Sequence, residues 1–117
     1  MNCRNHPSDA DFPATDLTAA GAAIAPEALF AALSAKMLGR IAQWNSGEGF
    51  STVRADWLAR AVGVGEDIRV RLSDRELAGR FEALDDTGGL VLRLPDGNVT
   101  TITAGDVFMT APAAEAR

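Results

Sequence analysis

Residues with the chemistry for catalysis are few in this 117-residue chain. His6 is its sole histidine and Cys3 its sole cysteine, so we expect neither a Cys-His-Asp triad nor a metal site built from several histidines. Cys3 lacks a CxxC partner, and a bystander thiol is the simpler interpretation. Neither G-x-x-x-x-G-K-[ST] nor G-x-G-x-x-G, the phosphate-binding loop patterns, occurs in the sequence. The individual residues therefore predict no catalytic centre.

Composition narrows the class of protein. The chain is 47% hydrophobic and 23% charged with a net charge of −5, which is typical of a globular domain. Its arginines are scattered among acidic residues, so we expect no nucleic-acid binding. Without an apolar run of about 20 residues, a membrane span is not expected either. The lone cysteine indicates a reducing compartment, and we predict a cytoplasmic protein.

The first half of the chain carries two helical patterns. Residues 27–45 place large apolar side chains three and four positions apart, and 45–47 (Asn-Ser-Gly) are residues that end helices. A second helix follows, capped by Ser51 or Thr52 and stopped by Gly63 and Gly65. We expect these helices to form a hairpin. Loop composition in 1–13 predicts a frayed or surface-draped N-terminus, and 14–25 is compatible with a short helix that Asp16 or Thr18 would cap.

The second half, 67–110, alternates apolar and polar residues in short runs. Ile68 and Val70 begin this alternation, and Leu90 and Leu92 repeat it after the turn residues 85–89. Four or five strands this short must curl or close to protect their edges. We therefore predict an α+β chain: an N-terminal loop and helical hairpin (1–65), a small SH3-like β-barrel (66–112) and a disordered tail (113–117).

Several segments, in the right order, also match a known pattern. Residues 12–17 read FPATDL, residues 79–90 read GRFEALDDTGGL, and residues 104–107 read AGDV. Together with the helices before them, they resemble the C-terminal portion of a biotin protein ligase. Enzymes of that family use ATP to make biotinyl-AMP, and then transfer biotin to a lysine of a carboxylase carrier domain.

The resemblance implies roles for three residues. Asn2 would face the adenine of ATP or biotinyl-AMP, and Phe12 would pack on that base. Asp106 would reach the nucleotide through Mg²⁺ or by orienting a basic neighbour. The family usually has a cationic residue where Thr110 stands, and its G-R-G-R-x-G-R and K-W-P-N-D segments are absent from this chain. We therefore expect help with nucleotide ordering and with contact to the biotin carrier domain, but no activity from this chain alone.

Two further interpretations stay open at the level of sequence. A non-catalytic protein–protein interaction module could have kept the ligase barrel, and a small-ligand regulatory domain is a weaker third possibility. Apolar side chains on the helices also predict self-association. The residues expected to drive it are Phe30, Met37, Trp44 and Trp57.

Overall fold

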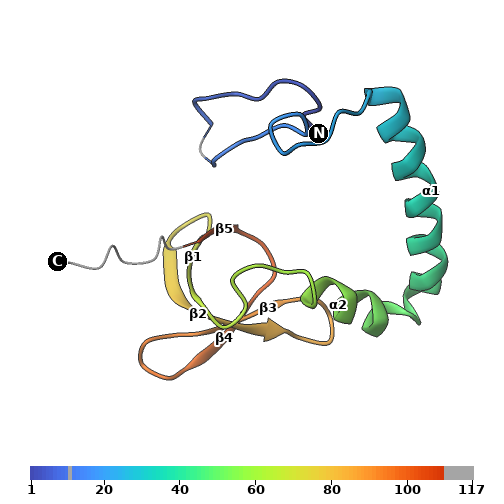
Figure 1. Ribbon diagram of the computed structural model, residues 1–117. Helices are drawn as coiled ribbons and strands as arrows, with labels where there is room; N and C mark the ends of the chain where they lie inside the picture. Colours follow the sequence, from blue (N-terminus) through green and yellow to red (C-terminus); the bar gives the residue numbers. More distant parts are fainter. Residues whose placement is uncertain (11, 110–117) are drawn as a thin grey trace. The chain divides into compact units, whose positions relative to one another are not determined.

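The computed structural model describes residues 1–10 and 12–109. The chain divides into two compact units, Met1–Gln43 and a second unit that begins at Trp44. The helices are α1 (Pro26–Trp44) and α2 (Phe50–Leu58), with the 3₁₀ turn η1 (Asn45–Gly47) between them (Figure 1). The strands are β1 (Asp67–Arg71), β2 (Glu76–Leu84), β3 (Leu90–Arg93), β4 (Val99–Ile102) and β5 (Asp106–Met109). The α+β class is confirmed, and the predicted tail 113–117 lies outside the described residues.

The five strands form one antiparallel sheet in the order β4-β3-β2-β1-β5. In a flat sheet the two edge strands, β4 and β5, would lie roughly 19 Å apart, at about 4.8 Å per strand. The link from Ile102 to Asp106 spans at most about 14 Å. The sheet must therefore curve strongly. No ladder joins β4 to β5 in the described chain, so the sheet is open and the predicted closure into a barrel is not confirmed.

An apolar core fills the concave side of this sheet. Its four buried members come from β1, β2 and β3, and they are Ile68, Val70, Phe81 and Leu92. Each such side chain contributes about 1.5–3 kcal/mol by leaving water. Leu72, Leu77, Leu84, Leu90, Leu94 and Ile102 pack around them in partly buried positions. The alternation in the sequence thus predicted the correct faces of β1 and β3.

Gly79 lies in β2 close to the backbone of β3. A β-carbon there would stand 2.5 Å from the Arg93 carbonyl oxygen and 2.9 Å from Cγ of Leu92. Contacts that short are forbidden by sterics, so this position requires glycine. The first glycine of the GRFEALDDTGGL segment is therefore needed for strand packing.

Helix α2 is fastened to the sheet by polar and aromatic contacts. Arg54 donates from Nε (3.1 Å) and Nη2 (2.7 Å) to the Leu84 carbonyl oxygen, and the rings of Trp57 and Phe81 lie 6.4 Å apart. The prediction that Ser51 or Thr52 caps this helix is wrong, because the N-cap is Gly49 and makes no side-chain bond. The Phe50 ring instead packs against the turn at Gly88, so tertiary packing sets the first turn.

Helix α1 has the predicted extent to within a residue, and it ends as predicted. Asn45 and Ser46 take positive φ values of 48° and 56° immediately after it. None of its side chains is buried, and its large apolar residues are exposed: Phe30, Leu33, Met37, Leu38, Ile41 and Trp44. Packing of α1 and α2 as a hairpin stays a prediction. Among the described residues, no helix has both the length and the apolarity that crossing a membrane requires.

The first unit differs from its prediction before α1 begins. Residues 17–21 form turns, not a helix, although Asp16 does accept a capping bond from the Ala19 amide at 2.7 Å. Of the two forms predicted for the N-terminus, frayed or surface-draped, fraying does not apply to residues 2 and 3, because they are hydrogen-bonded to 17 and 18. Gly21, with a φ of 93°, reverses the chain where a helix would have continued.

Candidate functional site

The three predicted site residues lie in two separate regions of the chain. Asn2 and Phe12 belong to the first unit, and Asp106 belongs to the second. We call the first region the N-terminal cluster (residues 2, 3, 6, 12 and 15–19). We call the second region the Asp106 groove, and each is described by itself.

Backbone pairing holds the N-terminal cluster together. The amides of Leu17 and Thr18 donate to the carbonyl oxygens of Asn2 (3.0 Å) and Cys3 (3.1 Å). The Thr18 hydroxyl donates to the same Cys3 oxygen at 3.0 Å. In addition, the Asn2 side chain donates from Nδ2 to the Thr15 carbonyl oxygen at 3.2 Å. Hydrogen bonds thus join two short segments that belong to no helix or strand.

A buried carboxylate lies at the centre of this cluster. Asp16 is 7% exposed, and its Oδ2 lies 2.6 Å from Nδ1 of His6. The Ala19 amide donates to its other oxygen. These bonds lower the pKa of Asp16 below its ordinary value, the Ala19 backbone bond most and the His6 bond next. Asp16 is therefore ionised at neutral pH, with both oxygens occupied.

The His6–Asp16 pair was missed by reasoning from sequence. We expected the single histidine to have no role in a triad, and no described contact joins it to Cys3 in one. Pairing with a carboxylate ten residues away depends on how the intervening chain turns. The only local signals were the turn-forming residues at its two ends, Pro7 after His6 and the ATD segment at 14–16.

Asn2 and Phe12 are both accessible in the N-terminal cluster. Asn2 is exposed, and Phe12 is 43% exposed, which leaves ring surface for stacking on a planar ligand. The structure therefore allows the roles that the resemblance implies for both residues.

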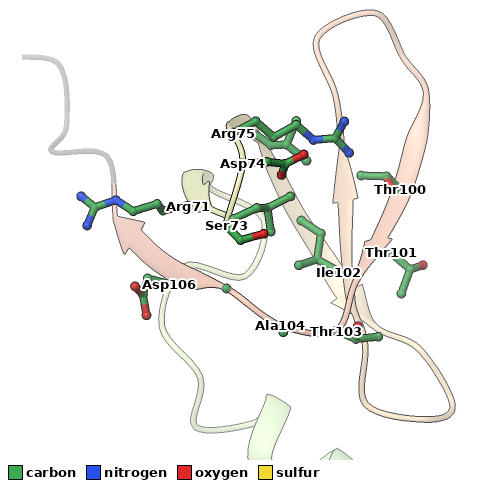
Figure 2. A pocket seen from close by; sticks show the side chains of 13 residues that line it. Arg71, Ser73, Asp74, Arg75, Thr100, Thr101, Ile102, Thr103, Ala104 and Asp106 are labelled. Carbon is green, nitrogen blue, oxygen red and sulfur yellow. The ribbon is translucent and has the colours of Figure 1, made fainter.

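The Asp106 groove is a cavity of about 630 Å³ at one end of the curved sheet. Asp106 is the first residue of β5 and faces Arg71 of β1 in the ladder. Figure 2 shows that the β1–β2 turn, β4 and the β4–β5 link enclose the cavity. Its lining residues are Arg71, Leu72, Ser73, Asp74, Arg75, Leu77, Thr100, Thr101, Ile102, Thr103, Ala104, Gly105 and Asp106.

Two arginines line this groove, and their side chains take different directions. The Arg71 guanidinium lies over the Phe108 ring, 4.5 Å from its centroid, and extends away from the cavity (Figure 2). Arg75 extends along the cavity rim toward the side where Thr100 lies (Figure 2). Arg75 is thus the groove's own cation. The sequence did not single out Arg75, because the β1–β2 turn that carries it meets β4 and the β4–β5 link only in the folded chain. Thr110, where a cation was sought, lies outside the described residues.

The groove offers few ligands for a metal ion. Within the described parts of the chain, no three His, Cys, Asp or Glu side chains are grouped to hold one. Mg²⁺ is commonly held by one or two carboxylates, completed by water and substrate phosphates. Asp106 could supply one such carboxylate, and the remaining oxygens would have to come from a bound nucleotide and water.

Comparison with known proteins defines the class to which this sheet belongs. Residues 63–110 match the family model of the biotin protein ligase C-terminal domain. The biotin–[acetyl-CoA-carboxylase] ligase of Paracoccus denitrificans is 47% identical over 60 residues, 51% of this chain and 25% of that protein.

Solved structures share the fold over nearly the whole chain. The biotin protein ligase of Aquifex aeolicus superposes with a TM-score of 0.79 at 15% identity, covering 94% of this chain and 50% of that one. A structure of the Aquifex aeolicus enzyme in complex with biotin and ATP gives a TM-score of 0.76 at 16% identity, covering 92% and 47%. At these identities the likeness concerns the fold alone.

The second unit therefore carries a biotin protein ligase C-terminal domain. Over nearly its whole length the chain shares the fold of the C-terminal half of biotin protein ligase structures, and half of it is similar in sequence to a curated member of that family. It spans about half the length of the solved structures, and its match covers a quarter of the curated relative.

Proposed function

We propose that this chain works as part of a biotin protein ligase, in which it helps to order the nucleotide and contacts the carrier protein. The observation that carries the proposal is the match of residues 63–110 to the ligase C-terminal domain. The activity proposed for the complete enzyme is ATP-dependent biotinylation of a carrier lysine through biotinyl-AMP. We do not expect this chain to perform it alone, since the glycine–arginine loop and lysine segment of the family are absent from the sequence.

In the N-terminal cluster, Asn2 would meet the edge of the adenine and Phe12 its face. An exposed amide and a partly exposed ring suit those two contacts, because a purine presents hydrogen-bonding groups at its edge and an apolar face. The Aquifex aeolicus ligase in complex with biotin and ATP supports a nucleotide site in this fold. For the present chain, ATP and biotinyl-AMP remain proposed ligands.

In the Asp106 groove, Asp106 would act on the nucleotide's phosphates through Mg²⁺ or through a basic neighbour. Arg71, which pairs with Asp106 across the β1–β5 ladder, is the candidate neighbour, and a guanidinium matches phosphate geometry well. The hydroxyls of Thr100 and Thr101 on β4 line the groove and supply further donors. The strong curvature of the sheet supports an SH3-like architecture that is left open between β4 and β5.

The outer rim of the same domain is our candidate for the carrier contact. Arg69 and Arg71 stack on Phe108 there, 5.4 and 4.5 Å from its ring centroid. Such an aromatic flanked by arginines is a common composition for protein contact surfaces. The biotin carrier domain of a carboxylase is the proposed partner, and a cytoplasmic location remains a prediction.

Calorimetric titration of the chain with ATP–Mg²⁺ and with a non-hydrolysable biotinyl-AMP analogue tests the nucleotide role. We expect binding that Phe12→Ala weakens by about tenfold, the scale of one lost stacking contact. Phe30→Ala is the matched control, since it removes an exposed phenylalanine from α1. Absence of binding at millimolar ligand would reject the nucleotide role and favour the alternative.

The alternative is a non-catalytic interaction module derived from the ligase barrel. One observation favours it: α1 has no buried residue and exposes six large apolar side chains. Exposed apolar surface of that kind marks a contact site. If the chain binds the carrier domain but no nucleotide, this alternative replaces the ligase role.

A further inference from the structure

The orientation of the Asn2 side-chain amide is fixed by its hydrogen-bond partner, the backbone carbonyl of Thr15. The Thr15 carbonyl oxygen only accepts hydrogen bonds, so the Asn2 side chain must turn its NH₂ group, Nδ2, toward it. Its oxygen, Oδ1, then points elsewhere and is left to accept. This assignment follows from the chemistry of the partner, because the reverse orientation would place two acceptors together.

The position of the Thr15 carbonyl depends in turn on the His6–Asp16 pair. Asp16 follows Thr15 directly, and it is the only buried residue among the described positions of the first unit. Its bond to His6 joins residues 15–19 to the segment that precedes them, and its bond to Ala19 holds the turn that follows Thr15. Nδ1 of His6 can donate to the carboxylate whether the ring is neutral or protonated.

We propose that His6 and Asp16 are a positioning pair, which sets the Asn2 amide to read a hydrogen-bond donor on a purine and so favours adenine over guanine. The inference rests on the nucleotide role proposed above and deepens it. Neither side chain needs to touch the ligand. They act through the Thr15 carbonyl, which keeps Oδ1 of Asn2 facing outward.

The chemistry of the two bases explains the expected selectivity. Adenine carries an amino group at C6, which donates a hydrogen bond to Oδ1 of Asn2. Guanine carries a carbonyl oxygen there, so two acceptors would face each other. If the His6–Asp16 pair is broken, the segment holding Thr15 loosens and the amide can rotate to offer its NH₂ group to guanine. Loss of the pair should therefore change the preference between bases as well as overall affinity.

The experiment compares titrations of the full chain with ATP–Mg²⁺ and GTP–Mg²⁺. We expect the unmodified chain to prefer ATP by roughly tenfold. That is the scale of the difference between a base that donates a hydrogen bond to Asn2 and a base that places a second acceptor opposite it. His6→Ala and Asp16→Asn should reduce that preference to about twofold or less. His6→Asn should keep it, because the asparagine nitrogen lies near the position of Nδ1 and can still donate to Asp16. Asp9→Asn, which removes an exposed carboxylate from the same segment, is the control.

Amide hydrogen exchange shows whether each variant is altered only where intended. His6→Ala should speed exchange at Leu17, Thr18 and Ala19, while the amides of Val70 and Leu92 in the sheet core stay as slow as before. The exchange pattern thus separates a local change from general unfolding, and the base preference is read from variants with an intact sheet.

The outcomes test the positioning pair and the nucleotide role separately. A preference for ATP that falls in His6→Ala and survives in His6→Asn supports the positioning pair. A preference that His6→Ala leaves unchanged overturns the pair and leaves the proposed nucleotide role standing. No binding of either nucleotide by the unmodified chain overturns the nucleotide role itself, and the inference that rests on it.

Discussion

The two units of this chain are stabilised by different physical means. The second unit buries four apolar side chains, Ile68, Val70, Phe81 and Leu92, beneath a curved sheet. The first unit buries no apolar side chain among its described residues, and its one buried group is the Asp16 carboxylate. Apolar burial is non-directional and changes little with pH. A buried carboxylate depends on correctly placed donors and on its own charge. The first unit should therefore respond to conditions that leave the second unchanged.

This contrast bears on where recognition takes place. Two of the proposed nucleotide contacts, Asn2 and Phe12, lie in the unit that hydrogen bonds hold together. Such a unit has a low cost of local opening, and binding loops are commonly drawn from regions of that kind. The sheet offers a rigid groove instead, with Asp106 fixed by its ladder to β1. The four experiments below test the contrast, from the largest expected effect to the smallest.

Leu92→Ala should produce the largest loss of stability. Leu92 is fully buried in the core, and truncating such a leucine costs about 3 kcal/mol through lost transfer energy and the cavity left behind. Urea unfolding followed by fluorescence of the two tryptophans would measure it. Leu38→Ala makes the same chemical change at a side chain that is 71% exposed, and it should change the free energy of unfolding by less than about 0.5 kcal/mol. Equal effects from both would refute the proposed location of the core.

Gly79→Ala should destabilise the sheet by about 2 kcal/mol, because the added methyl group must push β3 away from β2. Its position would be 2.5 Å from the Arg93 carbonyl oxygen. Gly39→Ala is the matched control in α1, where an added β-carbon meets no atom within 4 Å. That substitution should stabilise the helix by up to about 1 kcal/mol. Thermal unfolding of both variants gives the comparison, and a tolerated alanine at position 79 would contradict the close approach.

Self-association through α1 is the third expectation. Met37 lies on the exposed apolar stripe and is 51% exposed. We expect Met37→Lys to weaken association by about tenfold, since one buried methionine is worth about 1.5–3 kcal/mol. Ala35→Lys adds the same charge to the polar face and should have little effect. Sedimentation across a concentration series measures both variants, and an unmodified chain that stays monomeric at high concentration would exclude the interface.

The contrast between the units also explains how far the sequence could predict the structure. Period-two alternation at Ile68–Val70 and Leu90–Leu92 predicted strands and buried faces, because a strand's side chains alternate whatever its neighbours are. The same local rules identified α1 and the residues that end it. They did not predict that β5 pairs with β1, which places Asp106 beside Arg71, nor that the sheet stays open.

The N-terminal cluster was predicted least well, for a related reason. The contacts that join its two segments are hydrogen bonds across 10 to 15 residues, as between His6 and Asp16 or Cys3 and Thr18. Such bonds leave no periodic trace in composition, and a polar segment with prolines reads as a loop. Only the resemblance to the ligase family pointed to Asn2 and Phe12, and their roles stay proposals.

The smallest and most local effect should come from acid. The pKa of Asp16 is lowered from its ordinary value of 3.8, chiefly by the Ala19 amide and then by His6. A carboxyl with a lowered pKa in the folded state contributes stability above the unfolded value, and that stability is lost as pH falls through the folded value. The N-terminal cluster should therefore keep its order down to about pH 4 and lose it below that.

Amide exchange at Leu17, Thr18 and Ala19, followed as the pH falls, would locate this transition after correction for the intrinsic pH dependence of exchange. Asp16→Asn should abolish the transition, because an amide cannot be protonated in this range. The Asp85 turn in the second unit provides an internal comparison. Its carboxyl also has a lowered pKa, caused first by the Gly89 amide, yet the apolar core beneath it does not titrate. Protection that vanished at one pH in both units would mean that they open together, and the division into a polar and an apolar unit would be wrong.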